Sequence, residues 1–120
     1  MNKRLIIYIF QTISECNTNL ECILRNKNDT AVSAQFSSQA FYCIKQLQNL
    51  IYSNEIETAY FDSYYQHFLY LNQLFLENSD SEKPLDQEYE ILKSKCRDFE
   101  NNLNFMAKQD ITASENMFFI

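Results

Sequence analysis

The sequence predicts an all-α protein, a single-domain antiparallel up-down four-helix bundle that spans residues 1–120 and ends in an apolar tail. The 120-residue chain contains no glycine and one proline, whereas strand-rich folds use many tight turns that favour glycine at positive φ. Apolar residues make up 46% of the chain, which is enough for one core in a domain of this length. These residues recur at heptad spacing in four separate segments, and each segment predicts an amphipathic helix.

The most regular of these segments lies near the C-terminus. We expect it to form a helix over about residues 84–108, since Pro84 is tolerated in a first helical turn and the polar stretch 78–84 separates it from the preceding helix. A stripe of this length must pack against partner helices. Its apolar members, at alternating spacings of four and three, are Leu85, Tyr89, Leu92, Cys96, Phe99, Leu103 and Met106.

The first helix is expected over about residues 2–25, and the polar cluster at residues 26–29 ends it. Asn17, Thr18 and Asn19 are weak helix formers in its middle, and Thr18 with Glu21 matches a capping box. The pattern therefore leaves open a kink or break near these residues. The apolar stripe of this helix consists of Ile6, Ile9, Ile13, Cys16, Leu20 and Ile23.

A second helix is expected over about residues 30–52, with Asp29 or Thr30 as its N-cap. Ser53 and Asn54 then interrupt the apolar pattern, which indicates the end of this helix. We assign its stripe to Phe36, Ala40, Cys43, Leu47 and Leu50.

The third helix is expected over about residues 55–77. Asn54 followed by Glu57 fits the cap-plus-acid pattern of a helix start. Because the connections between these long helices are short, sequential helices should be antiparallel neighbours. The stripe of the third helix consists of Phe61, Tyr64, Phe68, Leu71 and Phe75.

Residues 110–120 are expected to form a tail after the fourth helix. This tail ends in Met117, Phe118, Phe119 and Ile120. Large apolar side chains gain roughly 1.5 kcal/mol or more each when they are buried. The tail is therefore expected either to fold back over the bundle or to dock on another chain.

The sequence lacks the common catalytic motifs. Without glycine, the chain has no phosphate-cradling loop and no nucleophile elbow. His67 is the only histidine, and Tyr64 occupies the position three residues before it, so the paired Glu-x-x-His motifs of di-iron bundles are absent. The four cysteines form no Cys-x-x-Cys pair, and three of them lie on apolar stripes. We expect a protein that is not an enzyme and that holds no cofactor and no metal ion.

Targeting signals are also weak. No stretch approaches the run of about 20 apolar residues that is needed to span a bilayer. Lys3 and Arg4 precede an apolar run over residues 5–10, but no small-residue cleavage site follows it. These features predict a cytoplasmic protein without a membrane partner.

The chain carries a net charge of −6 at pH 7, and the negative charge is concentrated in one region. Residues 1–54 have a net charge of +2 and residues 55–90 have a net charge of −8. An acidic field repels nucleic acid and anionic membranes and attracts a basic partner. The same region carries tyrosines beyond its apolar stripe, and aromatic residues with a charged rim are typical of protein interfaces.

We therefore expect a non-enzymatic inhibitor that binds a protein with a basic surface, such as an immunity-type protein that neutralises a toxin. A nuclease is one candidate toxin, because its substrate site must be basic and an acidic surface can block it by charge complementarity. The expected partner is thus a protein and not a nucleic acid. The residues assigned to partner binding are Tyr60, Asp62, Tyr64, Tyr70, Glu77, Asp80, Glu82, Asp86, Glu88 and Glu90.

Two alternatives stay open. The first is a structural or regulatory adaptor that forms a homodimer or binds a partner helix in a groove. Ile7 and Tyr8 lie off the stripe of the first helix, and such a second apolar surface favours homodimerisation. The second alternative is an anti-defence inhibitor that mimics the charge of nucleic acid.

Overall fold

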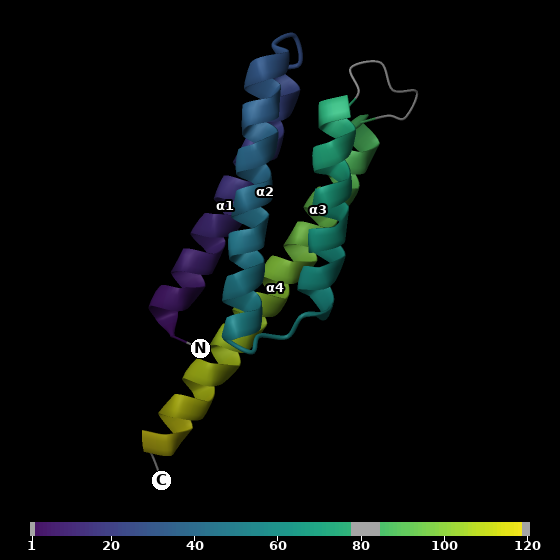
Figure 1. The fold of residues 1–120 in the computed structure, drawn as a ribbon. Coiled ribbons are helices and arrows are strands. Elements are labelled where there is room, and N and C mark those ends of the chain that lie inside the picture. Colours follow the sequence, from purple (N-terminus) through teal and green to yellow (C-terminus); the bar gives the residue numbers. More distant parts are fainter. Residues whose placement is uncertain (1, 78–84, 119–120) are drawn as a thin grey trace.

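The computed structural model describes the backbone of residues 2–77 and 85–118 and the side chains of residues 2–77 and 85–109. Within these residues it contains four helices, α1 (Lys3–Arg25), α2 (Thr30–Ser53), α3 (Ala59–Glu77) and α4 (Leu85–Phe118). The chain runs up α1, down α2, up α3 and down α4, so that sequential helices are antiparallel (Figure 1). The predicted all-α, up-down four-helix bundle is confirmed.

Side chains cap the first two helices. The side chain of Asn2 accepts a hydrogen bond from the backbone N–H of Arg4 at 2.7 Å, at the start of α1. Asp29 is the N-cap of α2, and its carboxylate accepts from the backbone N–H of Val32 at 3.1 Å. Of the two predicted N-caps for this helix, Asp29 is therefore the one that the structure uses.

The α1 helix is continuous, so the sequence pattern around Asn17 does not break it. The asparagines in this turn instead bond to other helices. Asn17 Oδ1 accepts a hydrogen bond from the Tyr64 hydroxyl at 2.6 Å, and Asn17 Nδ2 donates to Cys96 Sγ at 3.4 Å. Asn19 Nδ2 donates to Cys43 Sγ at 3.4 Å. Interhelical contacts thus compensate for the low helix propensity of these residues.

The third helix begins at Ala59, four residues later than the sequence pattern indicates. Asn54 ends α2 instead of starting α3, because its side chain donates a hydrogen bond to a carbonyl in the last turn of α2. Glu55 then adopts a positive φ of 54°, which turns the chain, and Ile56 inserts into the core. Glu57 caps the new helix, since its carboxylate accepts from the Ala59 backbone N–H at 3.0 Å.

The fourth helix does not end near Lys108, as the sequence predicts, but continues to Phe118. Figure 1 shows its last turns extending past the ends of the other helices. The backbone of residues 110–118 is therefore helical and not an irregular tail. The packing of the four terminal apolar side chains, and the predicted linker at 78–84 with Pro84, lie outside the residues whose structure is described.

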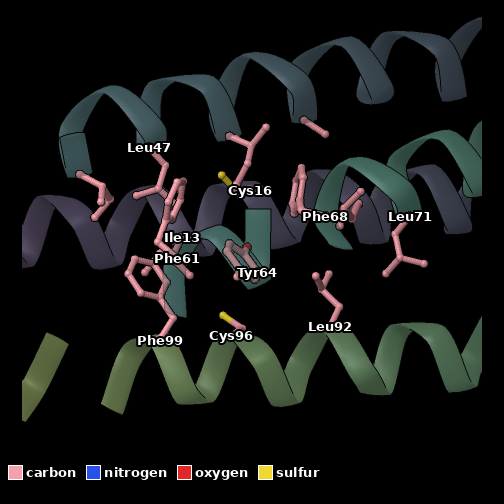
Figure 2. Packing of buried hydrophobic residues seen from close by; sticks show 14 of the residues in the cluster. Ile13, Cys16, Leu47, Phe61, Tyr64, Phe68, Leu71, Leu92, Cys96 and Phe99 are labelled. Carbon is pink, nitrogen blue, oxygen red and sulfur yellow. The ribbon is translucent and has the colours of Figure 1, made fainter. Parts of the chain in front are cut away.

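The stripes predicted for three of the helices form the core. In α1, α3 and α4 the central stripe residues are buried, and their side chains meet between the helices (Figure 2). Aromatic rings from two helices dominate the middle of this core: the ring centroids of Phe61 and Phe99 are 5.5 Å apart, and those of Tyr64 and Phe99 are 6.0 Å apart. Stripe residues at the ends of the bundle, such as Leu85 and Met106, are half-buried.

The stripe predicted for α2 is only partly correct. Ala40 and Leu47 are fully buried, but the other central positions are filled by Ile44 and Ile51. The predicted Phe36, Cys43 and Leu50 lie beside this row, where they are half-buried. The true row continues toward the N-terminus of α2 through Ser33 and Ser37, and these serines hide it from an assignment based on apolar residues.

Candidate partner-binding surface

The residues assigned to partner binding do not form one continuous surface. Tyr60 and Asp62 lie in the first turn of α3, whereas Glu77 is its last residue. At about 1.5 Å per residue, roughly 26 Å separates Tyr60 from Glu77 along the helix axis. The acidic region of the sequence is therefore divided between the two ends of the bundle (Figure 1).

Tyr64 was assigned to partner binding, and the structure contradicts this assignment. Its side chain is fully buried, and its hydroxyl donates to Asn17 as described above. Burial of this kind raises the pKa of the Tyr64 hydroxyl well above its ordinary value. The position belongs to the apolar stripe of α3, and that role excludes contact with a partner.

At the lower end of α3, Tyr60 is 48% exposed and Asp62 is half-buried. The Tyr52 hydroxyl of α2 donates to Asp62 Oδ1 at 2.6 Å, and this hydrogen bond raises the pKa of Tyr52. The Asp62 carboxylate thus already has a partner within the chain. The exposed Glu55 and Glu57 of the α2–α3 connection lie at the same end.

The opposite end of the bundle holds a denser group of carboxylates where α3 ends and α4 begins. We call this group the acidic end; its described members are Glu77, Asp86, Glu88 and Glu90, with Tyr70 about two turns before Glu77 on α3. Asp86 and Glu88 lie in the first turn of α4, where the helix dipole favours negative charge. Asp80 and Glu82, also assigned to partner binding, lie outside the described residues.

Two carboxylates of the acidic end contact His67 and Lys93 of the same chain. His67 Nε2 lies 3.4 Å from Glu88 Oε2 and 3.1 Å from the backbone carbonyl oxygen of Glu88. Lys93 Nζ lies 3.1 Å from Glu90 Oε1. The side chains of Glu88 and Glu90 nevertheless remain 25% and 66% exposed. Both carboxylates are therefore accessible to a cation of a partner.

Among the described residues, no ion pair joins Glu77 or Asp86 to a cation. Glu77 is exposed and its Oε1 accepts a hydrogen bond from Gln73 Nε2 at 2.8 Å. Asp86 is exposed. Tyr70 is 37% exposed, and the centroid of its ring lies 5.7 Å from that of His67. The acidic end thus combines exposed carboxylates with an aromatic ring.

The cysteines have the chemistry of core residues. All four are free thiols, and Cys16 and Cys96 are buried among apolar side chains. Burial, together with the carboxylate of Glu100, which accepts from its thiol at 3.0 Å, raises the pKa of Cys96 to about 12. Burial also raises the pKa of Cys16. Both are neutral thiols at pH 7, whereas nucleophilic cysteines are thiolates.

Sequence reasoning missed a second exposed surface, which lies on α2. Tyr42 is 76% exposed and Phe41 is 45% exposed. The sequence does indicate this surface, because Lys45 is the only charged residue among the 24 residues of α2. A surface helix with so little charge is unusual, whereas interface cores are depleted of charged residues.

The described residues also bear on metal sites and membrane-spanning helices. No three histidine, cysteine, aspartate or glutamate side chains in the described part of the chain lie close enough to hold a metal ion. Over the same residues, no helix has the length and apolar character that a membrane crossing requires. The acidic end and the exposed face of α2 are the two surfaces described above. The chain matches no protein-family model, no curated protein and no solved structure.

Proposed function

We propose that this protein is a non-enzymatic inhibitor that binds a partner with a basic surface, as an immunity protein binds a toxin. The observation that carries the proposal is the acidic end, where Glu77, Asp86, Glu88 and Glu90 gather at the junction of α3 and α4. A nuclease is a suitable partner, because its substrate site must attract phosphates and is therefore basic.

Electrostatics supports this use of the acidic end. Grouped carboxylates at one end of an elongated molecule raise the local concentration of a basic partner and accelerate association. The overall charge of −6 acts in the same direction. The acidic end is also built on the ends of two packed helices, so its carboxylates are held in place before binding and lose little freedom on association.

Contact area near these charges comes from Tyr70 and His67. Tyr70 is partly exposed beside the imidazole of His67, which in turn contacts Glu88. Tyrosine contributes apolar area and a hydroxyl at a low entropic cost, which is why it is frequent at interfaces. The proposed binding surface therefore has an aromatic centre next to its charged part.

The test compares two triple variants in capture experiments from lysates of the source cells. Glu77→Lys, Asp86→Lys and Glu90→Lys together reverse the exposed carboxylates of the acidic end. The matched control reverses three exposed acids elsewhere, Glu15→Lys, Glu55→Lys and Asp98→Lys, and changes the net charge equally. Circular dichroism of both variants should show the helical content of the wild-type protein.

We expect the wild-type protein and the control variant to capture a basic protein from the lysate, whereas the acidic-end variant does not capture it. The wild-type protein and the control variant should also inhibit the activity of this captured protein. Association of the wild-type protein should slow by about tenfold or more between low and high salt. A partner that binds the acidic-end variant as tightly as it binds the wild-type protein would contradict the proposal. So would a partner whose own activity is unaffected by binding.

A further inference from the structure

Two cysteines from different helices meet in the middle of the α1–α2 pair. Cys16 of α1 is fully buried, and its sulfur lies on the side of α1 that faces α2 (Figure 2). Cys43 of α2 is half-buried, and its sulfur accepts a hydrogen bond from the Cys16 thiol. Both thiols are free, so the two residues form a reduced dithiol whose sulfurs are already in contact.

A second contact with α1 fixes the position of the Cys43 sulfur. Asn19 Nδ2 donates to Cys43 Sγ at 3.4 Å. Because Asn19 follows Cys16 by three residues, the two side chains are neighbours on one face of α1, and the Cys43 sulfur packs against that face. Sulfurs held in contact across two packed helices can bond through side-chain rotations, with little movement of the backbone.

The two thiols differ in their access to solvent. Cys43 lines an open hollow of about 470 Å³ between α1 and α2, together with residues that include Glu15, Asn19 and Tyr42. This volume admits a small oxidant such as hydrogen peroxide. Cys16 is fully buried and does not line the hollow. Cys43 is therefore the thiol that an oxidant meets first, and Cys16 lies behind it in the place of a resolving thiol.

We infer that Cys16 and Cys43 form a disulfide when the protein meets a peroxide, and that this bond cross-links α1 to α2. The Cys43 thiolate attacks one oxygen of hydrogen peroxide, the O–O bond breaks, and the departing hydroxide takes up a proton to become water, which leaves Cys43 as a sulfenic acid. The Cys16 sulfur then attacks the Cys43 sulfur. The S–S bond forms, the S–O bond breaks, and the hydroxide leaves with the Cys16 proton as a second water. In total the two thiols lose two electrons and two protons, and one peroxide is reduced to two waters.

The surroundings of Cys43 set the pH dependence of the first step. Burial and the nearby carboxylate of Glu15 raise the pKa of Cys43, and the hydrogen bonds from Asn19 and Cys16 oppose this rise without cancelling it. The thiolate of Cys43 is therefore a minor form at pH 7, and its fraction increases about tenfold with each pH unit. Oxidation is slow at neutral pH and accelerates as the pH rises, and the contact between the two sulfurs makes the second step intramolecular.

Treatment of the folded full-length chain with hydrogen peroxide at pH 7 and pH 8, followed by thiol counting and peptide mapping, tests this inference. We expect the chain to lose two of its four free thiols and to yield one linked peptide pair that contains Cys16 and Cys43. The reaction should be roughly tenfold faster at pH 8 than at pH 7. The oxidised chain should melt at least about 5 °C above the reduced chain, because the cross-link restricts the unfolded state, and dithiothreitol should restore both thiols.

Three variants separate the roles of the cysteines. Cys22→Ser is the matched control, because Cys22 is also a half-buried free thiol, and it should form the same disulfide as the wild-type chain. Cys16→Ala should stop at the sulfenic acid of Cys43, which dimedone labels, whereas Cys43→Ser should leave Cys16 reduced. A wild-type chain that keeps all four thiols, links another pair or couples to a second chain would overturn the inference. Oxidation of Cys16 in the Cys43→Ser variant at the wild-type rate would overturn it as well.

Discussion

Single residues in the middle of the bundle connect helices that are distant in the sequence. Asn17 alone bonds to Tyr64 on α3 and to Cys96 on α4. The side chains of these three residues are neutral donors and acceptors. Burial raises the pKa values of Cys16, Tyr64 and Cys96. The folded state therefore holds these protons more tightly than the unfolded chain does.

This difference predicts that alkaline pH destabilises the fold. Below about pH 8.5, both states keep the thiol protons, and the free energy of unfolding does not depend on these groups. Above that pH the unfolded chain releases its protons first, so the free energy of unfolding falls as pH rises, until Cys96 itself ionises at about 12. Each group contributes a slope of about 1.4 kcal/mol per pH unit in this range.

Urea unfolding between pH 7 and pH 11 measures the slope. Cys96→Ala removes one titrating group, so its slope should be smaller by about 1.4 kcal/mol per pH unit. Leu92→Ala is the control, because it truncates a buried side chain in the same stripe of α4 without removing an ionisable group. It should lower stability equally at every pH. Parallel curves for the wild-type protein and Cys96→Ala would refute the account.

At the scale of the elements, each helix uses two faces for different purposes. The inner face of α4 supplies core residues, whereas the outer face carries most of the charges of that helix. In α2 the inner row contains Ser33 and Ser37 and the outer face contains Phe41 and Tyr42. The two faces of α2 are therefore less different in polarity than those of an ordinary surface helix.

Two phenylalanines of α4 test the assignment of its faces. Phe99 is fully buried against Phe61 and Tyr64, whereas Phe105, fewer than two turns later, is 58% exposed. We expect Phe99→Ala to lower the free energy of unfolding by roughly 3–5 kcal/mol. Phe105→Ala should change it by less than about 0.5 kcal/mol. Equal losses in urea unfolding would show that the inner face of α4 is assigned incorrectly.

The molecule as a whole is elongated, with extents of 62 × 23 × 19 Å, and its charge is distributed along that length. Carboxylates gather at the two ends, and Lys45 carries the single charge of α2 between them. The last turns of α4 add to the length because they pass beyond the other helices (Figure 1).

This overhang predicts that the C-terminal segment contributes little to the stability of the bundle. Removing residues 110–120 should change the free energy of unfolding by less than about 0.5 kcal/mol, because a short helical segment without partner helices is marginal by itself. Circular dichroism should show fewer helical residues with the same thermal midpoint. A large fall in the midpoint would show that the segment packs on the bundle.

The sequence by itself determined the number, order and approximate bounds of the helices. Heptad spacing and the absence of glycine were sufficient, because both act locally along the chain. The stripes of α1, α3 and α4 were predictable for the same reason. Glu57 could not be recognised as the cap of α3, since the turn at Glu55 depends on Ile56 reaching the core.

Only the tertiary structure decided which residues face a partner and which face the core. Tyr64 and Tyr70 are both tyrosines of the same acidic region, yet one is buried and the other exposed. The acidic region, continuous in sequence, is divided between two ends because α3 carries its first and last residues far apart. The burial of a side chain and the grouping of charges on a surface both depend on how the helices pack against each other. This packing brings together residues that are distant in the sequence, so a local sequence pattern cannot predict it.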